Sequence, residues 1–314
     1  MAKQVSEVRK DAVGRRVVIT AVRGARPHDG PEQQRAEKLT HKEKCFFCPG
    51  NEHTTPPEID RIEANGGWQV RCFPNKFPAF SAEAKKAYGR HEIIVESPEH
   101  QKSLSELSEE NVLNYLLMVK RRVEDARRDP KLAYTSVFKN EGAAAGASLY
   151  HTYTQLVSMD FVPDYVKRLA KKAAKVDKLR QKPSKTVFAK NAHFFAMCPK
   201  APRFHFEAWI VPLQPANSLH ELSGGQLASL ASILKSALSA LDAATGFGPY
   251  NVIFHSAPHA GGAFPFHLQL VSRLSTWAGF EIGTEVVMVS EIPEESARLL
   301  RAKLAEKGDA NAVS

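Results

Sequence analysis

The sequence predicts an α+β fold built from two copies of one unit, because of two observations. The chain repeats itself: residues 103–108 (SLSELS) reappear as residues 218–223 (SLHELS), and residues 155–158 (QLVS) reappear at almost the same offset as residues 269–272. Each copy also has the same succession of a strand-like run, a helical pattern and further strand-like runs. Self-similarity of this kind is typical of a duplicated unit, here a β-sheet with a helix packed on one face.

The first copy begins with the apolar run HEIIVES, which predicts a strand near residues 93–96. The SLSELS signal then leads into a helix, and residues 134–138 (YTSVF) predict the strand that follows it. Apolar residues at helical spacing mark the buried stripe of the helix. They are Val112, Tyr115, Leu116, Val119 and Val123.

The second copy has the same order of elements. The run FEAWIVP predicts a strand near residues 208–211, and residues 250–254 (YNVIF) predict the strand after the helix. The helix between them has a wide apolar stripe. Its members are Leu227, Leu230, Ala231, Leu234, Leu238 and Leu241.

These units divide the chain into a first half at residues 1–160 and a second half at residues 191–303. Residues 161–190 are rich in lysine and arginine, and their apolar positions have helical spacing, which predicts a connector helix with a basic, solvated face. Residues 304–314 end in GDANAVS and are expected to form a flexible tail.

The bulk composition indicates a cytoplasmic protein with anionic partners. At 314 residues and 43% hydrophobic composition the chain is long enough for two cores. The start MAKQVSEVRK has no apolar core of a signal peptide, and no uninterrupted apolar run is long enough to cross a bilayer. No membrane partner is therefore expected. Four cysteines are too few for a disulfide framework, so we expect a reducing compartment. The net charge of +9 favours phosphorylated metabolites or nucleic acid.

Cys45 and Cys48 form a Cys-x-x-Cys pair, which is one half of a possible zinc site. No second Cys-x-x-Cys is present, so histidines would have to complete a tetrahedral set. The alternative is two small cysteines half-buried in a turn.

A loop of small residues, NEGAAAGAS, runs directly into His151, Tyr153 and Gln155 at alternate positions. Its glycines let the backbone approach a ligand closely, and exposed N–H groups suit phosphate oxygens. Alternate residues of a strand share one face, so an imidazole, a phenol and an amide are expected beside a phosphate-sized cradle.

The ordered landmarks of the chain resemble those of galactose-1-phosphate uridylyltransferases and of the similar ADP-glucose phosphorylases. They are CxxCPGN, FPNKFPAF at residues 73–80, SPEH before SLSELS, NEGAAAGAS with HxxxQ, AGFEIGT at residues 278–284, and PEESARLLR. The resemblance spans about residues 10–303. It implies two tandem histidine-triad-like halves and a homodimer whose sites borrow residues across the interface. It also implies a UDP- or ADP-hexose and a hexose 1-phosphate as partners, and makes nucleic acid an unlikely one.

The resemblance also implies the ligands of one zinc ion. The matching positions are Cys45, Cys48, His100 and His151. His100 could instead cap the adjoining helix. A second metal site known in some members looks absent or altered, because Pro265 stands where a histidine is expected.

Substrate contacts follow from the same resemblance. The paired arginines reach the phosphates of the nucleotide sugar, the FPNKFP asparagine contacts the nucleotide, the small-residue loop cradles phosphate, and the AGFEIGT residues lie near the hexose. The paired arginines are Arg23 and Arg26, and the asparagine is Asn75. The loop residues are Asn140, Gly146 and Ser148, and the residues near the hexose are Phe280 and Glu281. The alternative is that these residues do not bind substrate: the arginines would be ordinary surface residues, the asparagine a turn residue, and the glutamate an acid at the end of a strand.

Members of the family work by a ping-pong mechanism, in which a histidine attacks the α-phosphorus and the glutamine two positions on steadies the non-bridging oxygens. Here Tyr153 holds the nucleophile position and Gln155 the glutamine position. A phenol forms covalent intermediates in some enzymes, although a free phenol is mostly neutral at pH 7. His267 stands at the pseudo-equivalent place of the second copy, where a structural role is favoured.

Three hypotheses therefore stand. The chain is a nucleotidyltransferase or phosphorylase with Tyr153 as nucleophile or as an orienting group for direct displacement, or it is a zinc-stabilised binding protein for a nucleotide or nucleotide sugar. The third is a nucleic-acid-associated protein that uses the basic stretch at residues 167–190.

Overall fold

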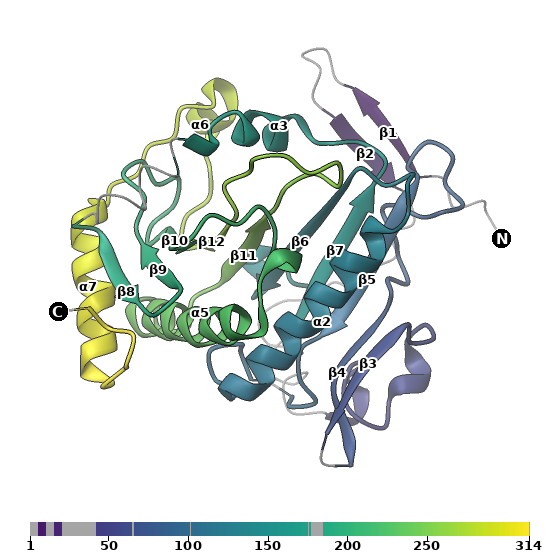
Figure 1. The fold of residues 1–314 in the computed structure, drawn as a ribbon, viewed down its shortest axis with the longest axis horizontal. Coiled ribbons are helices and arrows are strands. Elements are labelled where there is room, and N and C mark those ends of the chain that lie inside the picture. Colours follow the sequence, from purple (N-terminus) through teal and green to yellow (C-terminus); the bar gives the residue numbers. More distant parts are fainter. Residues whose placement is uncertain are drawn as a thin grey trace.

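A single large β-sheet forms the centre of the protein in the computed structural model, which describes residues 6–10, 16–20, 42–64, 66–100, 102–174, 176 and 185–313 (Figure 1). Its ten strands pair antiparallel in the order β3-β4-β5-β7-β6-β11-β12-β10-β9-β8. The strands are β3 (Asp60–Ala64), β4 (Gly67–Pro74), β5 (Gly89–Val95), β6 (Tyr134–Glu141), β7 (Tyr153–Met159), β8 (Val187–Lys190), β9 (Phe194–Met197), β10 (Ala208–Pro212), β11 (Tyr250–His255) and β12 (His267–Ser272). A separate antiparallel pair is formed by β1 (Ser6–Lys10) and β2 (Arg16–Thr20).

The strand order reads the same from either edge of the sheet. One edge runs β3-β4-β5-β7-β6 from the first copy, and the other runs β8-β9-β10-β12-β11 from the second. The α+β class and the duplicated unit are therefore confirmed. The two copies join through β6 and β11, where Asn140 lies opposite Asn251, so they share one continuous sheet rather than forming two.

Helices α2 (Glu109–Arg127) and α5 (Gly224–Thr245) pack against each other on one face of the sheet (Figure 1). Every residue of the two predicted stripes is buried there, in one core shared by both halves. Sheet residues with the opposite parity, such as Ile93 and Val95, point to the other face. On that other face, Ile93 and Val95 pack with Phe47, Phe73 and Tyr153.

The repeated SLxELS signal ends on a helix cap in both copies. The Ser108 side chain accepts the N–H of Asn111 at the start of α2. At the start of α5, the Ser223 side chain accepts the N–H of Gln226, whose own side chain accepts the N–H of Ser223. These serines satisfy N–H groups that the helix leaves without a partner, which explains why the signal recurs.

Among the described residues, helix α5 is long and apolar enough to cross a membrane by length and composition, although Lys235 and Asp242 interrupt its apolar run. However, 61% of its most apolar stretch is buried inside the protein. The apolar face of α5 is thus used by the shared core of the two halves.

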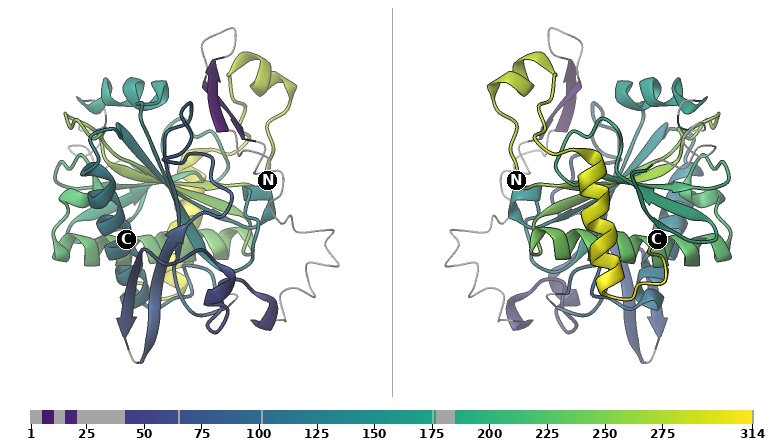
Figure 2. Two further views of the ribbon diagram at one scale, coloured as in Figure 1. Left: turned by 90° about the vertical axis from the view of Figure 1, so that its right-hand side faces the viewer. Right: turned by 90° about the vertical axis from the view of Figure 1, so that its left-hand side faces the viewer.

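The second half ends in helix α7 (Pro293–Glu306), which packs on α5 and β8 (Figure 2). The residues after it fold back instead of forming the expected flexible tail. The N–H of Lys190 donates to the carbonyl of Asn311 (2.8 Å), and the Asn311 amide donates to the Ser236 hydroxyl (2.9 Å). Polar end residues are anchored here by hydrogen bonds, which composition alone does not predict.

Two short α-helices, α3 (Asp164–Ala170) and α6 (Gly279–Thr284), are also present in the described part of the chain. Helix α3 lies at the start of the predicted basic connector, and helix α6 projects from the body of the protein (Figure 2). Lys167 and Arg168 of α3 are exposed, as expected for a solvated basic face. Much of the remaining connector, including residues 177–184, lies outside the described residues.

Candidate active site and metal centre

Two cysteines and two histidines form a compact cluster beside the sheet. The ligand atoms of the four predicted residues, Cys45, Cys48, His100 and His151, all lie within 4.8 Å of one another. The turn that carries the cysteines is shaped by Asn51, whose side-chain amide donates to the carbonyl of Cys45 (2.8 Å). The structure therefore brings together residues from three distant places in the sequence.

The contacts within this cluster suit a metal ion. The Cys48 sulfur lies 3.2 Å from Nδ1 of His100 and 3.6 Å from Nδ1 of His151. Nε2 of His151 donates to the carbonyl of Ser97 (2.7 Å), so Nδ1 of the neutral ring presents its lone pair to the cysteines. Two sulfurs and two nitrogens are the donor set of a closed tetrahedral site.

Burial changes the protonation of this cluster. It lowers the pKa of His151 to about 4, so the imidazole is neutral and able to bind a metal. Burial also raises the pKa of the Cys48 thiol to about 12, with the neighbouring Cys45 adding to the effect. A thiolate at this place needs a cation beside it, and a coordinated metal ion supplies that charge.

The strand that follows the cluster divides its side chains between the two faces of the sheet. His151, Tyr153 and Gln155 lie on the pocket side, whereas Thr152 and Thr154 point to the opposite face, as the period of two requires. Thr154 donates to Glu96 (2.6 Å), and the Thr152 hydroxyl bonds the same carboxylate. Glu96 thus binds the start of β7, called the functional strand below, from the face of the sheet opposite the pocket.

The group behind the strand is a fully buried ion pair. The Lys139 ammonium lies 3.0 Å from Glu96 and 2.9 Å from Glu141, and the Lys139 and Glu96 side chains have no exposed surface. Burial alone lowers the pKa of Lys139, but the two carboxylates outweigh it and raise that pKa above its ordinary value. Removing one member would leave an unpaired buried charge, at a cost of about 3 to 5 kcal/mol.

The small-residue loop between β6 and β7 depends on glycine at two positions. Gly142 and Gly146 have φ angles of 78° and 89°, in the region that other residues avoid. Asn251 of the second half donates its amide to Asn140 (2.8 Å) and to the carbonyl of Ala145 (2.9 Å). The second half therefore supports the loop, a contribution that the sequence analysis did not predict.

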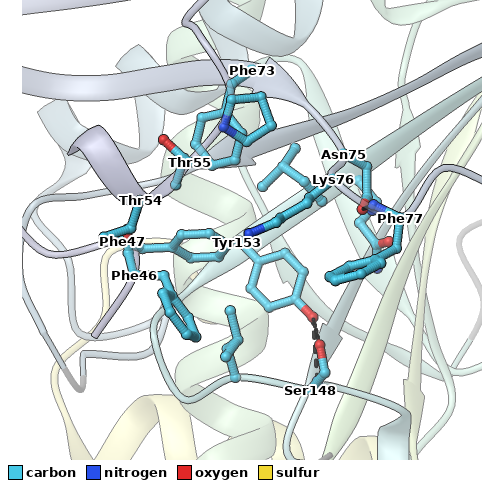
Figure 3. A pocket seen from close by; sticks show the side chains of 14 residues that line it. Phe46, Phe47, Thr54, Thr55, Phe73, Asn75, Lys76, Phe77, Ser148 and Tyr153 are labelled. Carbon is cyan, nitrogen blue, oxygen red and sulfur yellow. Dashed lines mark hydrogen bonds between the residues drawn. The ribbon is translucent and has the colours of Figure 1, made fainter. Parts of the chain in front are cut away.

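Tyr153 reaches from β7 into a pocket beneath this loop (Figure 3). Its hydroxyl oxygen lies 3.2 Å from the Ser148 hydroxyl and accepts the backbone N–H of Ser148 (3.3 Å). The pocket has a volume of about 170 Å³ and opens to solvent on one side. Its lining includes Phe46, Phe47, Phe73, Phe77, Asn75, Lys76, Ser148, Tyr153 and Gln155.

A histidine that the sequence analysis missed connects two of the pocket residues. Nε2 of His91 lies 3.1 Å from the side-chain oxygen of Gln155 and 3.1 Å from the amide nitrogen of Asn75. His91 is buried, with 5% of its surface exposed. Its even spacing from Ile93 along the predicted strand was the available signal, since it places the ring on the pocket side.

The pseudo-equivalent histidine of the second half lies in a different environment. His267 is buried, donates Nδ1–H to the carbonyl of Pro265 (2.7 Å), and stacks on His255 with ring centroids 4.5 Å apart. Trp209 contacts its other side at the same centroid distance. These packing contacts favour the structural role expected for His267.

Among the described residues, the cluster around Cys45 is the one group of three or more potential metal ligands that lie close together.

Of the predicted substrate residues that the structure describes, Asn75 and Ser148 line this pocket, and Asn140, Gly146, Phe280 and Glu281 do not. Phe280 and Glu281 lie on α6, where Phe280 is 46% exposed and the Glu281 carboxylate accepts the N–H of Ala278 (3.0 Å). Arg23 and Arg26 lie outside the described residues. The predicted role of Phe280 and Glu281 near the hexose therefore stays a prediction.

Comparisons with known proteins agree with this arrangement. Residues 2–163 match the family described as galactose-1-phosphate uridyl transferase, N-terminal domain, and residues 88–314 match a domain of unknown function, DUF4921. The chain is 28% identical to an ADP-glucose phosphorylase of Arabidopsis thaliana, with 95% of this chain and 93% of that protein aligned. It is 25% identical to a galactose-1-phosphate uridylyltransferase of Haemophilus influenzae, over 91% and 90% of the two chains. The crystal structure of an Arabidopsis thaliana ADP-glucose phosphorylase with bound ADP-glucose superposes with a TM-score of 0.77 and 29% identity, covering 94% of this chain and 98% of that one.

Proposed function

The chain belongs to the galactose-1-phosphate uridylyltransferase family, and from this premise we propose that it transfers a nucleoside monophosphate between a nucleotide sugar and a sugar phosphate or phosphate. The observation that carries the proposal is the position of the Tyr153 hydroxyl. It lies in the pocket against the N–H and hydroxyl of Ser148, with Gln155 in the same lining. A reactive oxygen and hydrogen-bond donors for phosphate thus share one site.

In the proposed reaction the Tyr153 oxygen forms a bond to the α-phosphorus, and the bond from that phosphorus to the bridging oxygen of the sugar phosphate breaks. The sugar phosphate leaves with the bonding electrons, and the phenol proton passes to it or to solvent. An acceptor phosphate then forms a bond to the same phosphorus, the bond to the Tyr153 oxygen breaks, and the departing phenolate takes up a proton from the acceptor or from solvent. The Gln155 amide stabilises charge on the non-bridging oxygens, and the Ser148 N–H, which donates to the Tyr153 oxygen, stabilises the phenolate.

The substrate class proposed here is a nucleoside diphosphate hexose, with UDP- and ADP-hexoses as the two candidates. Four phenylalanines line the pocket and offer rings against which a base can stack. They are Phe46, Phe47, Phe73 and Phe77. Asn75 supplies an amide in the same lining, and Arg23 and Arg26 remain proposed phosphate ligands.

Zinc is the metal proposed for the cluster of Cys45, Cys48, His100 and His151. Its two thiols and two imidazoles match the preference of zinc for sulfur and nitrogen ligands. All four positions are occupied by protein groups, so the metal would hold the start of the functional strand rather than react with substrate. Because His151 precedes Tyr153 by two residues, loss of the metal would loosen the nucleophile position.

A homodimer is proposed from the exposed apolar side chains around α6. Large apolar residues at positions 274–292 have between 36% and 66% of their surface exposed. Exposed apolar clusters of this kind are typical of interaction surfaces. In the proposed dimer, Phe280 and Glu281 serve the pocket of the second copy, since they do not line the pocket of their own chain. The exposed members are Leu274, Trp277, Phe280, Ile282, Val286, Met288 and Ile292.

We expect Ile282→Asp to convert a dimer to a monomer, because a charge at this exposed apolar position opposes burial in an interface. Molar mass from light scattering after gel filtration measures the change. Ile59→Asp is the matched control, since Ile59 is also exposed and apolar but lies outside residues 274–292. A monomeric wild-type protein would contradict the dimer.

The function itself is tested by incubating the wild-type protein with UDP-glucose or ADP-glucose and an acceptor, either phosphate or galactose 1-phosphate. We expect release of glucose 1-phosphate that depends on the protein. Isothermal titration of the same nucleotide sugars runs in parallel. Tight binding without release would support the zinc-stabilised binding protein and reject the transferase.

A further inference from the structure

His91 of β5 lies beside Gln155 of β7 on the same face of the sheet, and its side chain is buried. Its ring has a polar neighbour at each nitrogen. Nδ1 accepts the backbone N–H of Ala79 (3.1 Å), and Nε2 faces the side-chain oxygen of Gln155 (3.1 Å). The amide nitrogen of Asn75 also lies 3.1 Å from Nε2, while the Asn75 oxygen accepts the N–H of Phe77 (2.8 Å).

These neighbours select one tautomer of the neutral ring. A proton on Nε2 satisfies two contacts, because Nε2–H donates to Gln155 while the bare Nδ1 accepts from Ala79. A proton on Nδ1 satisfies only the contact from Asn75 and points at the Ala79 N–H, which is itself a donor. Exchanging the two ends of the Asn75 amide would break its bond to Phe77. The form with the proton on Nε2 is therefore favoured.

The tautomer decides which end of the Gln155 amide faces the pocket. With Nε2–H bonded to the Gln155 oxygen, the NH₂ end remains for a phosphate oxygen. With the other tautomer, the lone pair of Nε2 would repel the Gln155 oxygen, and a turned amide would present that oxygen to the anionic substrate. The first arrangement supplies a donor to the phosphate, and the second opposes phosphate binding.

We propose that His91 is a positioning residue: it holds the Gln155 amide with its donor end toward the transferred phosphoryl group. This inference rests on the proposed function, in which Gln155 stabilises the non-bridging oxygens. His91 also ties the loop of Asn75 and Ala79 to the functional strand. The His91 ring thus positions the side chains of Asn75 and Gln155, although it does not itself line the pocket.

Three variants separate this role from simple packing. His91→Phe keeps a ring but removes both nitrogens, so we expect kcat to fall about 10- to 100-fold, as for a catalytic group displaced by roughly 1 Å. His91→Gln places an amide near the position of Nε2 and should restore most of the rate. In a Gln155→Ala background, His91→Phe should cost little more, since the two residues act as one unit.

The matched control is His255→Phe. His255 makes the same kind of contact, with Nε2 2.8 Å from the Gln269 oxygen, and is equally buried at 5% exposure. It does not line the pocket of Tyr153. We expect it to change thermal stability as much as His91→Phe does while leaving kcat within about twofold. Equal losses of kcat in both variants would overturn the positioning role.

A spectroscopic measurement keeps the inference testable even if no nucleotide sugar reacts. Long-range nitrogen–proton NMR spectra of histidine-labelled protein report which ring nitrogen is protonated, and the His91→Gln variant assigns the signal. We expect His91 to be neutral with its proton on Nε2. A proton on Nδ1 overturns the inference, whereas the expected tautomer without any transfer would reject the proposed function alone.

Discussion

Replacement of Cys48 by serine is expected to strip the protein of its metal and to lower its free energy of unfolding by on the order of 5 kcal/mol. Serine is a poor zinc ligand, and the remaining groups cannot complete a tetrahedral site. Because Cys48 lies within 3.6 Å of both histidines, no other residue of the cluster substitutes for it at the centre. Metal content by mass spectrometry and unfolding in urea measure the two effects.

Cys198→Ser is the matched control for this variant. Cys198 is as deeply buried as Cys48, at 1% and 3% exposure, but it lies outside the cluster. We expect Cys198→Ser to retain one zinc per chain and to lose only the small stability that a buried hydroxyl costs, about 1 to 2 kcal/mol. Equal metal content in wild type and Cys48→Ser would reject the zinc centre.

Duplication and helix pattern were predictable because each depends on local chemistry. The stripes of α2 and α5 follow from side-chain spacing, and Ser108 and Ser223 cap their helices through bonds that reach three residues along the chain. The fusion of two sheets into one was not predicted. The sequence does not show that β6 pairs with β11, because the alternation of inward and outward side chains along a strand is the same whichever strand lies beside it.

The site shows the same division between local and long-range information. The metal cluster was expected because the resemblance supplied His100 and His151 to a pair of cysteines visible by spacing. The buried pair of Lys139 and Glu96 was not predicted, because charged residues are usually exposed unless a partner distant in sequence meets them. The part played by His91 depends equally on a loop that only the folded chain brings to it.

Tyr153→Phe is expected to lower kcat/KM for nucleotide-sugar cleavage by about 10³-fold or more, because it removes the oxygen proposed to attack phosphorus. Its loss of stability should stay near 1 kcal/mol, since only the bonds to Ser148 disappear. Binding of the nucleotide sugar should change little. Intact-protein mass should show a nucleoside monophosphate adduct in wild type and none in Tyr153→Phe.

Tyr153→His is the informative partner of this variant, because the resemblance to the family predicts a histidine at this position. A tyrosyl phosphodiester is more stable than a phosphorylated imidazole, so wild type should form its adduct in one rapid turnover and release it slowly. Tyr153→His should then accumulate less adduct and turn over faster with an acceptor present. If Tyr153→Phe instead keeps the wild-type rate, the phenol only orients the substrate, and the acceptor displaces the sugar phosphate directly.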